Sequence, residues 1–88
     1  MNIAYTPSFA AVVAMNNALM GAFSEDQDGV MVARIKLPLR HQLELVNSKE
    51  GLKNQLASLG IDAFHVDTSE TSEIVIEAGS VLTEYIAA

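Results

Sequence analysis

Residues 31–45, MVARIKLPLRHQLEL, carry the strongest secondary-structure signal in this chain. Apolar side chains occupy nearly every odd position, whereas the even positions are mostly charged or polar. Successive side chains of a β-strand point to opposite faces of a sheet. The period of two therefore predicts a strand over 31–45, with one face toward the core and the other toward water.

Pro38 interrupts this stretch and leaves a second interpretation open. Proline has no N–H to donate to a neighbouring strand, so it marks either a sheet edge or a break between two elements. A helix over 38–47 is the competing assignment, because the apolar residues there also recur at helical spacing. Those residues are Leu39, Leu43 and Val46.

The first 24 residues contain no charged side chain. Thr6 followed by Pro7 predicts the start of a helix, because a hydroxyl can cap the first turn and proline fits the first helical position. We expect this helix to end near Ala22. One of its faces carries Val12, Met15, Leu19 and Ala22, and an adjacent face carries Phe9, Val13 and Met20. A surface helix usually has charged residues on its wet face, so we expect a protein partner to cover the second apolar face.

The second half of the chain predicts a short helix over 49–59, with Ser48 as its N-terminal cap. Gly60 is expected to end this helix, because glycine readily adopts the left-handed conformation found at helix C-termini. Ile61 then makes the usual apolar contact back onto the helix.

Two strands are predicted after this helix, over 61–67 and 73–78, on either side of a polar turn at 68–72. A bend at 78–80 is expected to follow. The last segment, 81–86, fits either a strand or a short helix.

These elements predict a single α+β domain of 88 residues. We expect an N-terminal helix and a short second helix, packed on an antiparallel sheet of about four strands. Half of the residues are apolar and the chain has no cysteine. Small domains without disulfides or metals often gain stability by association, so the composition also points to a protein partner.

The formal net charge of the chain is −6, and its charges are unevenly placed. Residues 54–88 contain six acidic residues and no basic one. Arg34, Lys36 and Arg40 share the wet face of the predicted strand, but no aromatic side chain lies between them to stack on a base. Because an acidic chain also repels phosphates, direct binding to nucleic acid is not expected.

The sequence contains no complete signature of a catalytic or metal site. His65 and Asp67 share one face of a predicted strand, but no third ligand follows at suitable spacing. His41 lies on the apolar side of its predicted strand, where a structural role is expected. The acidic segment 24–29 resembles a calcium-binding loop, yet Ile35 stands where that loop requires a glutamate. We therefore predict no enzyme, cofactor, metal site or small-molecule substrate.

The uncharged opening is not expected to be a signal peptide or a membrane anchor. It lacks the basic residues that precede a signal sequence, and polar or helix-breaking residues interrupt its apolar run. Those residues are Pro7, Asn16, Asn17 and Gly21. We expect no signal peptide, no transmembrane segment and no membrane partner, and a location in the cytoplasm or in a virion.

Our functional hypothesis is a non-enzymatic protein–protein interaction module. We expect a structural subunit that assembles with copies of itself into a homo-oligomer or a larger, virion-type particle. Apolar contacts are expected from Tyr5, Phe9, Val13, Met20, Phe23, Tyr85 and Ile86. Charged contacts between subunits are expected from Arg34, Lys36 and Arg40 to Glu73, Glu77 or Glu84.

The alternative hypothesis is a small acidic inhibitor, of the kind that phages use against host defences. Such a protein would bind a host macromolecule through its acidic C-terminal third, in the manner of a nucleic-acid mimic. The two hypotheses differ in the effect of salt. Binding through charges weakens as salt rises, whereas association through apolar burial does not.

Overall fold

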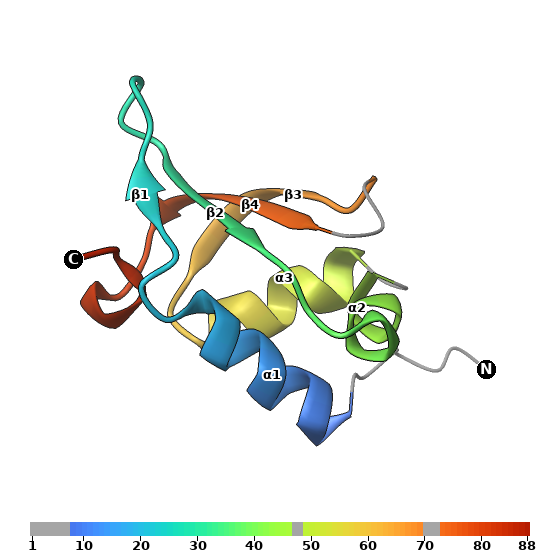
Figure 1. The fold of residues 1–88 in the computed structure, drawn as a ribbon. Helices are drawn as coiled ribbons and strands as arrows, with labels where there is room; N and C mark the ends of the chain where they lie inside the picture. The colour runs from blue at the N-terminus through green and yellow to red at the C-terminus, as the bar shows by residue number, and fades with distance from the viewer. Residues whose placement is uncertain (1–7, 47–48, 70–72) are drawn as a thin grey trace.

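A computed structural model describes residues 8–46, 49–69 and 73–88 of the chain (Figure 1). The α-helices are α1 (Phe9–Leu19), α2 (Leu39–Val46) and α3 (Lys49–Ser58), and a short 3₁₀ helix, η1, spans Thr83–Tyr85. The strands are β1 (Ser24–Glu25), β2 (Met31–Ile35), β3 (Asp62–Asp67) and β4 (Ile74–Ser80).

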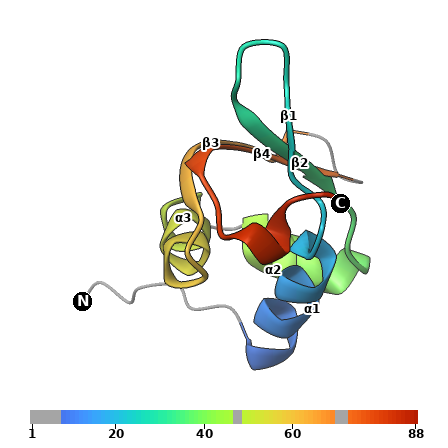
Figure 2. The same cartoon turned by 90° about the vertical axis from the view of Figure 1, so that its left-hand side faces the viewer.

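The strands form one antiparallel sheet in the order β1-β2-β4-β3. The α-helices all lie on the same face of this sheet, as two views at right angles show (Figures 1 and 2). The prediction of a small α+β domain with helices on an antiparallel sheet is therefore confirmed, with α2 as an additional helix. Among the described residues, no helix covers the opposite face of the sheet.

The core lies between the sheet and the helices. Alternate residues of β2 and β4 point toward the helices, as the period of two requires. The buried strand residues are Ala33, Ile35, Val66, Ile74, Ile76 and Ala78. The buried helical residues are Ala11, Met15, Leu19, Gln42, Leu45, Leu52 and Leu56.

The long strand predicted over 31–45 was wrong beyond Ile35, and the competing helix is present as α2. Pro38 precedes this helix, and its carbonyl accepts hydrogen bonds from the N–H groups of His41 and Gln42. A proline before the first turn costs no helical hydrogen bond and favours this geometry. His41 and Arg40 consequently lie on a helix and not on the predicted strand.

The first helix begins later and ends earlier than predicted. Ser8, not Thr6, is its N-terminal cap, and the Ser8 hydroxyl accepts a hydrogen bond of 3.2 Å from the N–H of Ala11. Thr6 and Pro7 themselves lie outside the described residues. The helix stops at Leu19, because Gly21 adopts a left-handed conformation with φ of 67°.

The predicted end of the helix over 49–59 is confirmed at Gly60 and Ile61. The N–H of Gly60 donates to the carbonyl of Ala57, and the N–H of Ile61 donates to that of Leu56. This pair of bonds is the Schellman arrangement, and both Ile61 and Leu56 are buried. Ser48, predicted as the N-terminal cap, lies outside the described residues.

The C-terminal segment differs from the prediction in one respect. The bend expected at 78–80 was wrong, because β4 continues through Ser80. After β4, the chain turns into η1, and Ile86 then forms a parallel bridge with Phe23. The segment 81–86, for which the sequence allowed a strand or a short helix, therefore forms a 3₁₀ turn followed by a single β-bridge.

The end of α3 generates a test of local backbone strain. Gly60 and Gly29 share a φ of 81°, but a Cβ at Gly60 would lie 2.6 Å from Leu82 Cδ1, whereas one at Gly29 meets nothing within 4 Å. We expect Gly29→Ala to lower the free energy of unfolding by about 1 kcal/mol and Gly60→Ala to lower it further. Urea denaturation measures both losses.

The variant Gly60→Ala/Leu82→Ala is the control for the contact with Leu82. We expect the double variant to be less stable than Leu82→Ala by the same free energy of unfolding that Gly29→Ala loses relative to the native protein. If Gly29→Ala and Gly60→Ala lowered the free energy of unfolding equally, a steric contact between residue 60 and Leu82 would be contradicted.

Candidate interaction surface

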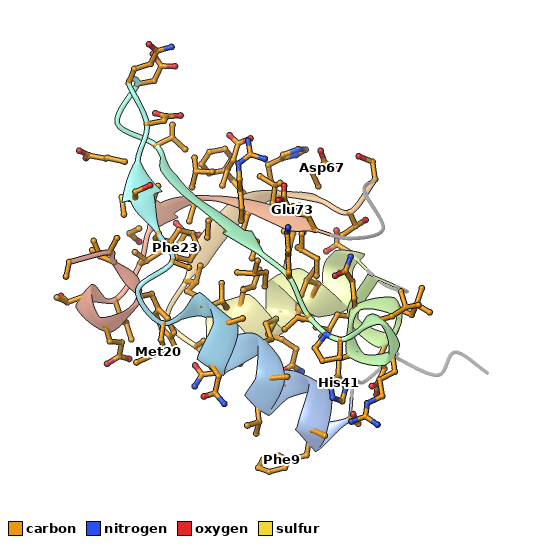
Figure 3. All side chains as sticks on the ribbon, viewed as in Figure 1. Phe9, Met20, Phe23, His41, Asp67 and Glu73 are labelled. Atoms are coloured by element: carbon orange, nitrogen blue, oxygen red, sulfur yellow. The ribbon has the colours of Figure 1, made fainter. Side chains whose placement is uncertain are left out.

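The outer face of α1, which points away from the sheet, carries exposed apolar side chains. Phe9 is 84% exposed, Met20 is 50% exposed and Val13 is 40% exposed. Figure 3 shows Phe9 on the side of α1 opposite the sheet, with Met20 at the other end of the helix. Phe9 and Val13 are four residues apart and lie on one side of the helix. Met20, the C-terminal capping residue just beyond α1, follows Val13 by seven residues, or about two turns. We call these three residues the α1 stripe.

The α1 stripe lies on a helix without a charged residue. Between Ser8 and Ser24 the chain has no acidic or basic side chain, and the polar residues nearest the stripe are Asn16 and Asn17. The opposite side of α1 is buried through Ala11, Met15 and Leu19. The helix is therefore apolar on two sides, as predicted, and its own domain covers one of them.

The N-terminal end of α1 is held by a carboxylate from α2. Glu44 accepts a hydrogen bond of 2.6 Å from the Ser8 N–H and one of 3.0 Å from the Ser8 hydroxyl. Hydrogen bonds from the Ser8 backbone and then its hydroxyl lower the pKa of Glu44 from its ordinary value of 4.5, and the nearby His41 acts in the same direction. One carboxylate thus fixes the capping residue of α1 against α2.

The C-terminal end of α1 is held by the last described segment of the chain. The Tyr85 hydroxyl donates a hydrogen bond of 2.5 Å to Asn16 Oδ1. The N–H of Gly21 donates to the carbonyl of Glu84, and the N–H of Phe23 donates to that of Tyr85. Because both ends of α1 are anchored, the α1 stripe has a fixed direction relative to the domain.

Two of the residues predicted at an interface belong to the core. Phe23 is fully buried and Tyr85 is 4% exposed, so neither side chain can reach a partner in this fold. Burial also raises the pKa of the Tyr85 hydroxyl. Ile86, the third apolar residue expected near the C-terminus, is 40% exposed. Tyr5 lies outside the described residues.

The charged residues do not form the single strip that the predicted strand implied. Arg34 lies on β2 and pairs within the chain with Glu73 at 3.0 Å. Lys36 follows β2 and Arg40 lies on α2, and both are exposed. An exposed ion pair such as Arg34–Glu73 is worth about 0.2–1 kcal/mol.

The outer face of the sheet carries an exposed Phe64 that the sequence analysis missed. The pairing of β3 with β4 shifts between Ala63 and His65, so that Phe64 is an extra residue in the strand. Such a β-bulge breaks the alternation of side chains. Glu77, another predicted interface residue, pairs in register with Val32 and His65 on this outer face.

Two of the acidic residues singled out in the sequence accept hydrogen bonds from the backbone of nearby turns. Asp67 accepts a hydrogen bond from the Ser69 N–H, and Asp26 of the acidic segment accepts from the N–H groups of Asp28 and Val30. Within residues 8–46, 49–69 and 73–88, no three histidine or carboxylate side chains are placed to hold a metal ion. These acidic residues therefore stabilise turns in this fold.

Leu39 and Leu43 on α2 are also exposed, and they were not predicted as surface residues. Their spacing of four residues fits one side of a helix, so the signal was present in the competing helical assignment of 38–47. The α1 stripe and this second apolar patch lie on different helices.

Comparisons with protein-family models, with curated proteins and with solved structures gave no match to this chain. Within the described part of the chain, every helix is too short or too polar to cross a membrane.

The contact between Ser8 and Glu44 generates a prediction of pH dependence. The folded-state pKa of Glu44 is lowered, so its stabilising contribution is present above the ordinary pKa and is lost as pH falls through the lowered value. We expect the native protein to lose more stability than Glu44→Gln between about pH 6 and about pH 3. Urea denaturation at several pH values measures this difference.

Glu25→Gln on β1 is the matched control, because Glu25 is an exposed glutamate outside the first turn of any described helix. Its stability is expected to follow the native pH profile. If Glu44→Gln also followed that profile, the hydrogen bonds from Ser8 would not stabilise the ionised carboxylate.

Proposed function

We propose that this protein is a non-enzymatic interaction module that associates with copies of itself through the α1 stripe. The observation that supports the proposal is a rigidly held, uncharged helix that presents Phe9, Val13 and Met20 to solvent. Burying such a side chain in a contact is worth about 1.5–3 kcal/mol relative to leaving it exposed. A second protein surface is thus the favoured covering for this face.

The charge of the chain supports a second copy as that surface. Two copies with a net charge of −6 repel each other over most relative orientations. Between Ser8 and Ser24 there is no charged side chain, so two α1 helices can approach without bringing like charges into contact on the helices. Association through this face is then driven by apolar burial.

The inhibitor alternative draws less support from the described residues. Glu73 is paired with Arg34, Glu77 lies on the outer face of the sheet, and Glu84 lies on η1 beside the end of α1. Glu73 and Glu77 therefore share the outer face of the sheet, where Arg34 compensates the charge of Glu73, whereas Glu84 lies apart from them beside α1. A mimic of nucleic acid requires its negative charges along one face.

The extent of assembly depends on how many surfaces take part. A two-fold contact through one face closes at a dimer. A larger particle of the virion type would require a second contact, and Leu39 and Leu43 on α2 are two of the exposed apolar residues outside the stripe, with Phe64, Leu82 and Ile86 elsewhere. The proposal for the α1 stripe therefore stands on its own as a homo-oligomeric contact.

Aspartate substitutions test the proposal. We expect Phe9→Asp and Met20→Asp each to weaken self-association by about tenfold or more, because each buries a carboxylate in the contact. Light scattering over a range of protein concentrations measures the change. Both side chains point to solvent in the monomer, so the free energy of unfolding at low concentration is expected to change by no more than about 0.5 kcal/mol.

Phe64→Asp is the matched control, because Phe64 is similarly exposed but lies on the sheet. It introduces the same charge on the opposite layer and is expected to leave association unchanged. If Phe64→Asp disrupted association while Phe9→Asp and Met20→Asp did not, the contact would lie on the sheet and the proposal would be overturned.

A further inference from the structure

The residues along the outer side of α1 have a symmetric spacing. Phe9, Val13, Asn16 and Met20 follow one another at intervals of four, three and four residues. A two-fold axis that crosses the helix between Ala14 and Met15 exchanges Phe9 with Met20 and Val13 with Asn16. Contacts between identical subunits are usually of this kind, in which one patch meets itself.

Charged residues flank both ends of α1. Glu44 binds Ser8 at the N-terminal end, and Arg40 lies one helical turn before Glu44 on the same side of α2. Glu84 lies at the C-terminal end, since its carbonyl accepts a hydrogen bond from Gly21. Arg40 and Glu84 are both exposed. Figure 1 shows the same arrangement, with α2 near the start of α1 and η1 near its end.

We propose that α1 pairs with α1 of a second copy in antiparallel orientation, with Phe9 of each copy against Met20 of the other. This proposal rests on the proposed self-association and specifies its geometry. The antiparallel arrangement brings Glu84 of one copy toward the end where the other copy carries Arg40 and Glu44. There Arg40 is the exposed partner for Glu84, because the Glu44 carboxylate is already held by Ser8. It also pairs an aromatic ring with a thioether, which is a favourable contact.

The parallel arrangement is electrostatically less favourable. It would bring Arg40 toward Arg40 and Glu84 toward Glu84, so that like charges meet at both ends of the helix. It would also place Asn16 against Asn16 at the centre and leave Phe9 against Phe9. The charges at the rim therefore select the antiparallel arrangement, whereas the α1 stripe supplies the apolar burial.

Cysteine cross-linking tests the geometry, because the native chain has no cysteine. Phe9 and Met20 lie about 16 Å apart along the helix at 1.5 Å per residue. Disulfides require Cβ atoms about 3.5–4.5 Å apart. In the antiparallel pair, a mixture of Phe9→Cys and Met20→Cys is expected to form the mixed disulfide at least about tenfold faster than either variant alone forms its own.

The mixed dimer retains one native contact between Phe9 and Met20, so the substitutions do not remove the whole interface. Phe64→Cys on the sheet measures the background rate of disulfide formation by collision. Circular dichroism checks that each variant is folded.

The possible results distinguish a failure of the antiparallel geometry from a failure of the proposed self-association. A dominant mixed disulfide supports the antiparallel pair. A dominant disulfide between two copies of Phe9→Cys, or no disulfide above the background while the native protein is dimeric, overturns the geometry and leaves self-association standing. A native protein that stays monomeric at all concentrations overturns both.

Charge reversal gives an independent readout. Arg40→Glu and Glu84→Lys are each expected to weaken dimerisation a few-fold, because each replaces two attractive pairs by repulsive ones. The double variant Arg40→Glu/Glu84→Lys restores the attraction with reversed signs and is expected to recover the native affinity. A double variant weaker than either single variant would contradict the antiparallel geometry.

Discussion

The structure depends on the packing of α1 against one face of a four-stranded sheet. Ala11, Met15 and Leu19 enter the core together with Ile35 and Ile76 of the central strands. In the described part of this chain, one layer of helices covers one face of the sheet. Because α1 is apolar on two sides and the domain covers one, the other side is left to solvent or to a partner. This constraint connects the composition of the chain to its proposed association.

The anchoring of α1 at both ends determines how its free face is presented. Glu44 holds the N-terminal cap and Tyr85 holds Asn16 near the other end, so segments distant in the sequence fix a short helix in one orientation. A surface that is already ordered loses little conformational freedom on binding. The same two anchors bring Arg40 and Glu84 to opposite ends of the helix. Stability of the monomer and geometry of the contact therefore depend on the same interactions.

Much of the fold follows from local sequence chemistry, whereas the candidate surface depends also on distant contacts. Gly60 could be predicted as a helix end because glycine alone adopts its conformation without strain. Leu39 and Leu43 satisfy both a period of two and helical spacing, so pattern alone could not separate a strand from α2. Tyr85 was expected at a surface, yet the backbone hydrogen bonds between 84–87 and 21–23 place it in the core. The bulge at Phe64 depends on the register with β4, which no local pattern specifies.

The central claim is that one uncharged face of α1 brings two copies together by apolar burial. Sedimentation equilibrium of the unmodified protein, over a wide concentration range and at low and high salt, tests it most directly. We expect a reversible dimer at both salt concentrations, with an affinity that changes by no more than a few-fold, because rim charges contribute little. A monomer at every concentration, or a dimer that dissociates fully in high salt, would contradict the claim.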